Sequence, residues 1–257
     1  MKEAILQAIA DIEKQEEVNV FYACESGSRA WGFPSSDSDY DVRFLYVRPR
    51  DWYLSVDLEF KRDVIERPIN DALDVSGWDV RKALQLLRKS NPPLLEWLTS
   101  PIVYKDDEVF TRLLQELIPK CYSRSACMFH YLNMARGNFR EYLRGDIVWV
   151  KKYFYVLRPL LAIRWLEERQ TPAPVEFSVL VRELVTDAEL KNEIDSLVER
   201  KRLGEELRRE GRIEIISRFI ESELSRLESL NIPRRDDKPE MDSLNSVFRE
   251  VLVRDES

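Results

Sequence analysis

Apolar positions along the chain follow two different patterns, and the change falls near residue 107. Residues 2–15 carry apolar side chains at helical spacing and predict an amphipathic helix. β-Rich runs at 18–24 and 40–47 predict two strands, the second ended by Pro49. Three shorter strands are predicted at 63–68, 72–78 and 102–104. The first part of the chain is therefore expected to form a small mixed sheet flanked by helices.

One helix of this part has well-marked ends. Asp79 is a good N-cap residue, and the next turns present one apolar stripe, made of Val80, Ala83, Leu84 and Leu87. The sequence Asn91-Pro92-Pro93 ends this helix. A strand that runs directly into a capped helix is predicted here.

After residue 107 the helical period is nearly continuous. Candidate helices span 108–118, 122–144, 147–169, 176–184, 187–203 and 204–230. Pro159 is expected to kink or break the third of them. The tail predicts a linker from residue 231 and a short helix at 242–253. The fold class is therefore predicted as α+β, with a mixed-sheet domain at 1–107, an α-helical domain at 108–230, and a linker with a short C-terminal helix at 231–257.

Composition narrows the class of protein. Of the 257 residues, 44% are hydrophobic, which suffices for a core and excludes global disorder. The net charge of −7 argues against coating nucleic acid by bulk electrostatics. No apolar stretch reaches membrane-spanning length, and Cys24, Cys121 and Cys127 lack metal-ligand spacing. We therefore expect a soluble, cytoplasmic protein with buried free thiols and no membrane partner.

The candidate chemistry lies between the first two strands. A turn at Gly27-Ser28 follows the first strand, and Asp39 and Asp41 open the second. Alternate residues of a strand project to the same side, so these two carboxylates would repel each other unless a cation lay between them. Carboxylate oxygens suit Mg²⁺, and the N–H groups of a Gly-Ser turn suit a phosphate. Nucleotide chemistry is therefore indicated.

A third carboxylate, Asp74, lies inside a later predicted strand. Asp71 and Asp79 compete for this role, although Asp79 already has an interpretation as a helix cap. Three acidic side chains on neighbouring strands would be costly to bury without a cation. Two Mg²⁺ ions held by them would form a clamp for a nucleoside triphosphate.

These residues resemble the nucleotidyltransferase superfamily that includes DNA polymerase β. More specifically, the chain is similar to predicted nucleotidyltransferases described as RNA-ligase-associated. The segments that carry the resemblance are 27–32, 37–43, 76–84, 90–98 and 151–159. The resemblance implies that Gly27 and Ser28 contact the triphosphate, that Asp39 and Asp41 bind both metal ions, and that Asp74 acts as the third, base-like carboxylate.

Several cations are further candidates for the triphosphate. Arg29 follows the Gly-Ser turn, and Lys82 lies on the helix after the third strand; for both, solvent exposure is the alternative interpretation. In the helical part, Lys151, Tyr155 and Arg158 recur on one predicted helix face with Lys152 beside them. The resemblance implies that such a face supplies lysine and tyrosine to the triphosphate. Residues 181–230 carry dense mixed charge, for which a solvated face is favoured over a nucleic-acid or partner surface.

The sequence thus predicts Mg²⁺-dependent transfer of a nucleoside monophosphate from ATP or another nucleoside triphosphate to a hydroxyl, with release of pyrophosphate. An RNA end fits the resembled family as acceptor, and a protein hydroxyl and a small molecule are alternatives. A non-catalytic or regulatory module with the same fold, such as a toxin–antitoxin component, is the alternative function. The intact set of acidic residues argues against it.

Overall fold

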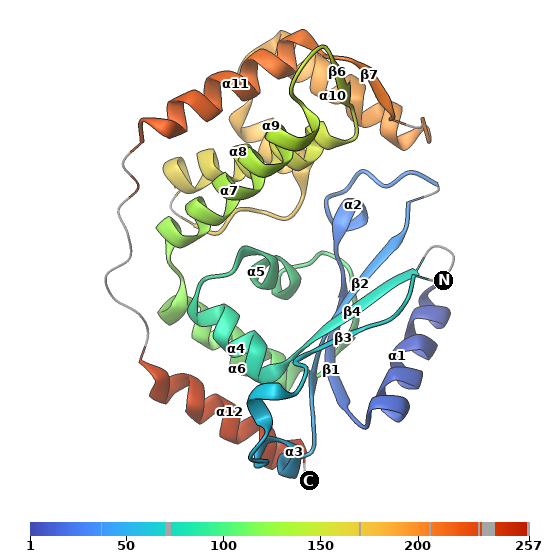
Figure 1. The fold of residues 1–257 in the computed structure, drawn as a ribbon, viewed down its shortest axis with the longest axis vertical. Coiled ribbons are helices and arrows are strands. Elements are labelled where there is room, and N and C mark those ends of the chain that lie inside the picture. The colour runs from blue at the N-terminus through green and yellow to red at the C-terminus, as the bar shows by residue number, and fades with distance from the viewer. Residues whose placement is uncertain are drawn as a thin grey trace. The chain divides into compact units, whose positions relative to one another are not determined.

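The computed structural model describes residues 1–36, 38–69, 73–169, 171–205, 207–230, 232 and 240–255. The chain divides into two compact units (Figure 1). The first unit comprises residues 1–30, 39–122 and the described part of 236–257, and the second comprises 31–38 and the described part of 123–235. Asp37 and Asp71 lie outside the described residues.

A five-stranded mixed sheet organises the first unit. Its strands are β1 (Asn19–Glu25), β2 (Tyr40–Val47), β3 (Val64–Glu66), β4 (Leu73–Asp79) and β5 (Val103–Asp106). They lie in the order β3-β4-β2-β1-β5, with β2 and β4 parallel and the other pairs antiparallel. The predicted bounds of β2 are confirmed, and β5 forms one edge of the sheet.

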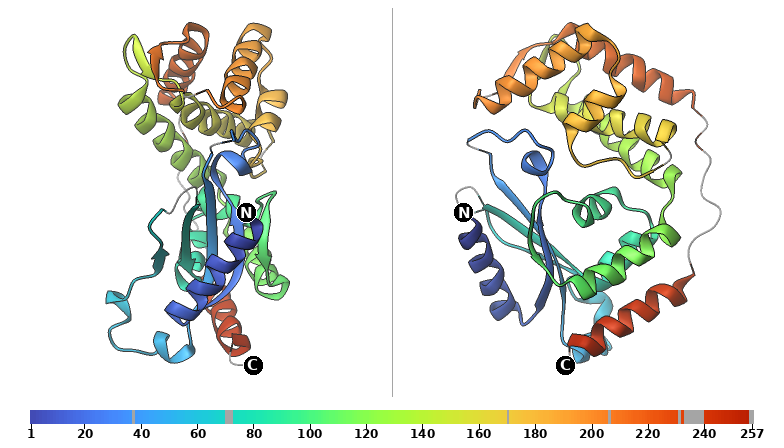
Figure 2. Two further views of the ribbon diagram at one scale, coloured as in Figure 1. Left: turned by 90° about the vertical axis from the view of Figure 1, so that its right-hand side faces the viewer. Right: turned by 180° about the vertical axis from the view of Figure 1, so that it is seen from behind.

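Helices cover both faces of this sheet (Figures 1 and 2). On one face, α1 (Lys2–Glu16) packs its apolar stripe into a cluster that includes Val20 of β1. The next residue, Phe21, points to the other face and meets Phe110 of α6 (Glu108–Cys121), with ring centroids 5.4 Å apart. The remaining helices of this unit are α2 (Gly27–Ala30), α3 (Arg50–Tyr53), α4 (Val80–Arg88), α5 (Pro92–Leu98) and α12 (Met241–Asp255).

The two faces of β2 differ as the alternation predicts. Val42 and Phe44 are buried in the cluster beneath α1, so Asp41 lies on the opposite face. Gly77 of β4 lies opposite Phe44 in the parallel pair, and a Cβ there would overlap the Phe44 ring. The glycine thus makes room for a large core side chain.

The cap predicted at Asp79 is confirmed. Its Oδ1 accepts a hydrogen bond from the Arg81 backbone N–H at 2.8 Å, and its Oδ2 accepts one from the Tyr53 hydroxyl at 2.7 Å. The side chain is almost fully buried, and this burial raises the pKa of Asp79 to about 6. The carboxyl group is therefore protonated more readily in the folded chain than in the unfolded chain.

This raised pKa makes stability depend on pH. Because the folded state binds the proton of Asp79 more tightly than the unfolded state does, proton binding stabilises the fold. This stabilisation is fully present below about pH 4 and is lost as the pH rises through about 6. We expect the free energy of unfolding to fall, relative to that of Asp79→Asn, by up to roughly 3 kcal/mol between pH 4 and 7. Urea unfolding of both proteins across this range measures the difference. A constant difference would show that Asp79 titrates alike in both states.

The second unit is mainly helical, with α7 (Arg124–Tyr142), α8 (Lys152–Arg169), α9 (Phe177–Leu184), α10 (Ala188–Arg202) and α11 (Glu214–Glu228). The interpretation of 147–149 and 209–211 as helix is wrong, because these residues form the antiparallel strands β6 (Ile147–Trp149) and β7 (Arg209–Gly211). Helix α8 continues through Pro159 without a break, since both sides of that residue are deeply buried and packing holds the helix together.

The two units divide the chain differently from the predicted domains. Helix α6 and helix α12 belong to the first unit, whereas residues 31–38 belong to the second. Within the second unit, Phe33 stacks on Phe154 with ring centroids 4.5 Å apart. The nearly buried Lys201 of α10 donates from Nζ to Ser35 Oγ at 2.7 Å. The loop just before Asp39 is therefore held by the helical unit.

The remaining expectations concern thiols and membranes. The three cysteines are free and buried, as predicted. Among the helices of the described residues, none is both long and apolar enough to cross a membrane.

Candidate active site

The parallel pairing of β2 and β4 brings two of the predicted carboxylates together. Asp41 and Asp74 face each other in register near the starts of these strands. Arg43, two residues along β2 on the same face, donates from Nη2 to Asp41 Oδ1 at 3.1 Å and to Asp74 Oδ2 at 2.8 Å. The side chains of the two aspartates remain 28% and 30% exposed, so the pair is accessible to solvent.

Arg43 was missing from the predicted site. Its guanidinium offsets the repulsion between the two carboxylates, the role that the sequence analysis assigned to a metal ion alone. Its Nη1 also donates to the backbone carbonyls of Val42 and Asp74, at 3.1 Å each. Its spacing from Asp41 could have identified it, because residues two positions apart in a strand share one face of the sheet.

Gly27 lies directly against the Asp41 carboxylate. Its φ of +59° falls in the left-handed region, and a Cβ at this position would overlap Asp41 Oδ2 and lie 2.8 Å from Asp41 Cγ. The Ser26 N–H donates to the Asp41 carbonyl at 2.8 Å. The turn that opens α2, with Gly27, Ser28 and Arg29, is thus built onto the first residues of β2.

A fully buried glutamate, Glu25, contacts the backbone of Asp41. Glu25, the last residue of β1, accepts from the Asp41 backbone N–H at 2.7 Å, and its other oxygen accepts from the Tyr104 hydroxyl. Burial raises the pKa of Glu25 above its usual range, and the nearby Asp41 carboxylate adds to the rise. Sequence reasoning missed Glu25, although an acidic residue that ends an otherwise apolar strand was the available signal.

Asp39 and Arg29 lie at the entrance to β2. Asp39 is exposed and comes one residue before the strand begins. The Arg29 Nε donates to the Asp39 carbonyl at 3.2 Å, and its guanidinium carbon lies 3.6 Å from the centroid of the Tyr40 ring. The structure therefore places Arg29 beside Asp39, and its role as a phosphate ligand stays a prediction.

The donor set has the chemistry that Mg²⁺ requires. Within the described part of the chain, no group of three or more His, Cys, Asp or Glu side chains is arranged to hold a metal ion. The carboxylates that the structure does bring together are the pair Asp41 and Asp74. Mg²⁺ commonly takes one or two carboxylates and completes its shell with water and phosphate oxygens. A two-carboxylate site beside the Gly-Ser turn fits that pattern.

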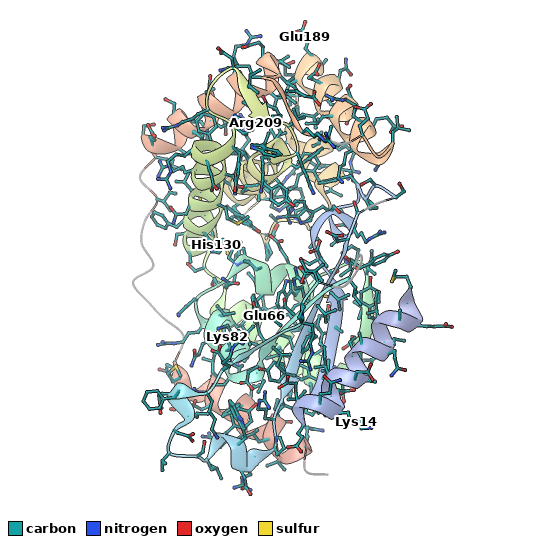
Figure 3. The ribbon with its side chains drawn as sticks, turned by 45° about the vertical axis from the view of Figure 1, so that its right-hand side comes forward. Lys14, Glu66, Lys82, His130, Glu189 and Arg209 are labelled. Carbon is teal, nitrogen blue, oxygen red and sulfur yellow. The ribbon has the colours of Figure 1, made fainter. Side chains whose placement is uncertain are left out.

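Lys82 lies elsewhere. Asp74 is near the start of β4, and Lys82 is on α4, beyond the end of that strand (Lys82 is labelled in Figure 3). The five residue steps from Asp74 to Asp79 alone span about 17 Å of strand. The Lys82 Nζ pairs with Asp63 Oδ1 at 2.9 Å. The structure thus does not bring Lys82 to the paired aspartates.

The predicted cationic face forms a cluster within the helical unit. Lys151 is exposed and directly precedes α8, while the Lys152 Nζ lies 4.7 Å from the centroid of the Tyr155 ring. Tyr155 and Trp31 pack edge to face, with ring centroids 5.5 Å apart. The guanidinium of the buried Arg158 lies 4.9 Å from the Trp31 ring centroid. Lys152, Tyr155 and Arg158 are thus gathered around the segment that follows the Gly-Ser turn.

A mixed sheet with a Gly-Ser turn against the first of two paired strand aspartates is the arrangement expected of nucleotidyltransferases of the DNA polymerase β superfamily. The chain belongs to the RNA repair pathway DNA polymerase beta family (RlaP), whose family model matches residues 1–250. This confirms the resemblance found in the sequence.

Two comparisons with individual proteins accompany this result. The chain is 53% identical over 227 residues to the uncharacterized protein YcgL of Bacillus subtilis strain 168. The aligned residues make up 88% of this chain and 86% of YcgL. A nucleotidyltransferase-like protein from Exiguobacterium sibiricum 255-15 is similar in structure at a TM-score of 0.33 and 13% identity, over 99% of this chain and 80% of that chain.

Proposed function

We propose that this protein is a Mg²⁺-dependent nucleotidyltransferase that moves a nucleoside monophosphate from a nucleoside triphosphate to a hydroxyl acceptor. The observation that carries the proposal is the register pairing of Asp41 with Asp74, with Gly27 packed against the Asp41 carboxylate. Family membership supports the same reaction class. The absence of a Cβ at Gly27 lets the Asp41 carboxylate lie directly against the turn.

The reaction itself needs little covalent chemistry from the protein. The acceptor oxygen attacks the α-phosphorus, the bond to the β-phosphate oxygen breaks, and pyrophosphate leaves. Gly27, Ser28 and Arg29 would bind and orient the triphosphate, and Asp74 would take the proton of the acceptor hydroxyl. Catalysis then rests on positioning and on electrostatic stabilisation of the phosphates.

Asp41 and Asp74, which the sheet register pairs, would hold Mg²⁺, and Asp39 is proposed as a further ligand although the structure does not group it with them. Two ions bound there would stabilise charge on the phosphates and acidify the acceptor hydroxyl. Arg43 contacts one oxygen of Asp41 and one of Asp74. The second Asp41 oxygen, Oδ2, faces Gly27. Arg43 would therefore hold the two carboxylates in alignment.

We propose an RNA end as the acceptor, because the description of the family to which the chain belongs names an RNA repair pathway. The test offers each of the four α-labelled nucleoside triphosphates to the protein with RNA, protein or small-molecule pools, with Mg²⁺ or with EDTA. We expect label to enter RNA only with Mg²⁺.

Other outcomes would select other functions. Label in the protein or small-molecule pool would replace RNA as acceptor while keeping the reaction. Triphosphate binding with no transfer to any pool would favour the regulatory alternative, such as a toxin–antitoxin component, and would contradict the proposed activity.

A further inference from the structure

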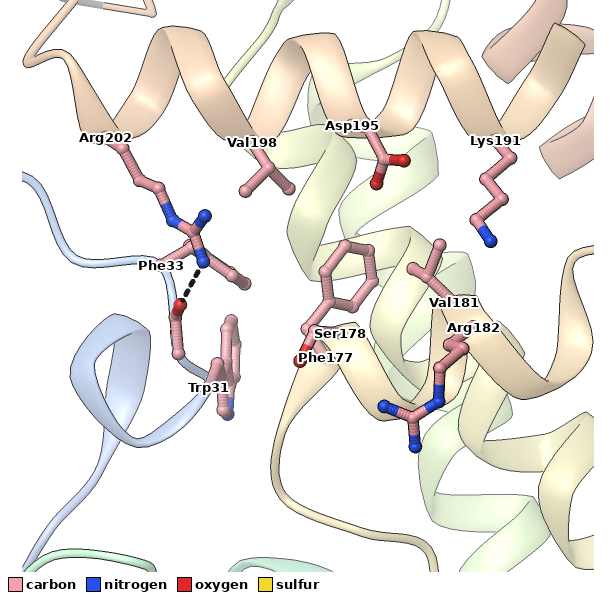
Figure 4. Close-up of a pocket in the computed structure, with 11 residues that line it drawn as sticks. Trp31, Phe33, Phe177, Ser178, Val181, Arg182, Lys191, Asp195, Val198 and Arg202 are labelled. Atoms are coloured by element: carbon pink, nitrogen blue, oxygen red, sulfur yellow. Dashed lines mark hydrogen bonds between the residues drawn. The ribbon is translucent and has the colours of Figure 1, made fainter. Parts of the chain in front are cut away.

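A pocket of about 300 Å³ lies within the helical unit, between residues 31–33 and helices α9 and α10 (Figure 4). Its volume is at the lower end of small-molecule sites, roughly 300–1,000 Å³, so it suits one planar group rather than a long chain. Trp31, Phe33 and Phe177 line it with aromatic surface. Of these three, Phe33 and Phe177 are buried in the core, and Trp31 is partly exposed.

Trp31 has the surroundings of a stacking platform. The buried Arg158 guanidinium lies 4.9 Å from the ring centroid, and Tyr155 and Phe33 pack around the ring at 5.5 and 5.9 Å. The Trp31 carbonyl accepts from the Phe177 N–H at 2.9 Å, which fixes the backbone. A rigid, partly exposed indole is suited to a nucleic-acid base, because every base has a π-face that can stack on it.

The charges of the pocket favour an anion. Helix α10 turns one face to it, at 191, 195, 198 and 202, and this face carries Lys191 and Arg202 with one acid, Asp195 (Figure 4). Arg182 of α9 adds a third cation, although its Nε is paired with Glu183 at 3.1 Å. Apart from the Arg182–Glu183 pair, two cations against one carboxylate make the rim locally positive on a chain whose net charge is −7.

Arg202 also ties the pocket to the loop. Its Nη2 donates to the Gly32 carbonyl at 2.9 Å, which uses one of the five N–H groups of a guanidinium. An anion could be bound by the same side chain. The same loop connects the pocket to the proposed active site along the chain, since Trp31 is three residue steps from Ser28, which limits the distance between their Cα atoms to about 11 Å.

We propose that this pocket binds one nucleotide of a single-stranded RNA acceptor, with the base stacked on Trp31 and the adjoining phosphate on Lys191 and Arg202. The inference rests on the proposed function for the identity of the acceptor. It adds an acceptor subsite on the helical unit, separate from the aspartates that would bind the triphosphate.

The test measures binding of a 5′-fluorescein-labelled, ten-nucleotide single-stranded RNA by fluorescence anisotropy. EDTA is present and nucleoside triphosphate is left out, so that neither the metal site nor turnover contributes. We expect Lys191→Gln to weaken binding about tenfold and to lower the slope of log affinity against log salt by about one. Trp31→Leu is expected to weaken binding about tenfold with the salt slope unchanged, and Trp31→Phe to retain part of the affinity.

Arg218→Gln is the matched control, because it removes one positive charge from the same unit at a residue that lines a different cavity. We expect its affinity to stay within twofold of the parent protein. Equal losses in Lys191→Gln and Arg218→Gln would indicate bulk electrostatics and overturn the proposal. So would unchanged RNA binding in Trp31→Leu, or equal binding of a duplex of the same length.

The two proposals can fail separately. RNA binding that depends on Trp31 and Lys191, in a protein that transfers no label, would overturn the activity and keep the subsite. Transfer to RNA that is unaffected by both substitutions would keep the activity and overturn the subsite.

Discussion

Replacing Asp41 by asparagine is expected to reduce nucleotidyl transfer about a thousandfold, which corresponds to roughly 4 kcal/mol of lost transition-state stabilisation. The substitution removes one of the two carboxylates that the sheet register brings together. An amide oxygen is a weaker ligand for a hard cation and carries no charge to balance Arg43. The measurement is the rate of label transfer at saturating Mg²⁺ and triphosphate.

The fold should survive this change, so the loss can be assigned to chemistry. The Asp41 backbone N–H and carbonyl make the contacts to Glu25 and Ser26, and neither involves the substituted side chain. We expect Asp39→Asn to act in the same direction. Thermal unfolding followed by circular dichroism checks both variants, and full activity of either one would make its assignment as a metal ligand wrong.

Asp63→Asn is the matched control for both. It removes one carboxylate from the same unit, where Asp63 pairs with Lys82 at 2.9 Å beyond the far end of β4. We expect activity within twofold of the parent protein. A loss as large as that of Asp41→Asn would mean that the charge of the whole unit, rather than the paired aspartates, governs the reaction.

The sequence pattern predicted the strands of the site because their alternation is a local property. The buried positions Val42 and Phe44 identify the core face of β2, so the orientation of Asp41 follows from the period of two. The pairing of β2 with β4 is a different matter. It joins residues more than thirty positions apart, and no local pattern specifies that Asp41 and Asp74 share one register position.

The residues that sequence reasoning missed act through tertiary contacts. In the sequence Glu25 is marked only as the end of a strand, because its hydrogen bond to the Asp41 N–H joins two different strands. Residues 31–38 read as a connection inside the first domain, yet Phe33 and Lys201 fasten them to the helical unit. The strands at 147–149 and 209–211 stabilise each other only as a pair, so helical periodicity dominated in each segment alone.

Gly27→Ala is expected to impair both stability and activity. Alanine must adopt a φ near +59° at a cost of roughly 1–2 kcal/mol, and its Cβ would overlap the Asp41 carboxylate. Relief of that overlap requires Asp41 or the turn to move, which would displace a carboxylate from its partner Asp74. Because a misplacement of about 1 Å can cost on the order of a hundredfold in rate, we expect a loss of at least that size.

Gly145→Ala separates the two causes. Gly145 also has a positive φ, +92°, but among the described residues no heavy atom beyond Gly145 and its two chain neighbours lies within 4 Å of the position that its Cβ would take. This variant therefore introduces backbone strain without a collision, and we expect a loss of stability in urea with transfer activity unchanged. If Gly27→Ala lost no more activity than Gly145→Ala, contact between the turn and Asp41 would not matter for the reaction. A rate loss confined to Gly27→Ala would instead assign the requirement for glycine to the space that the Asp41 carboxylate occupies.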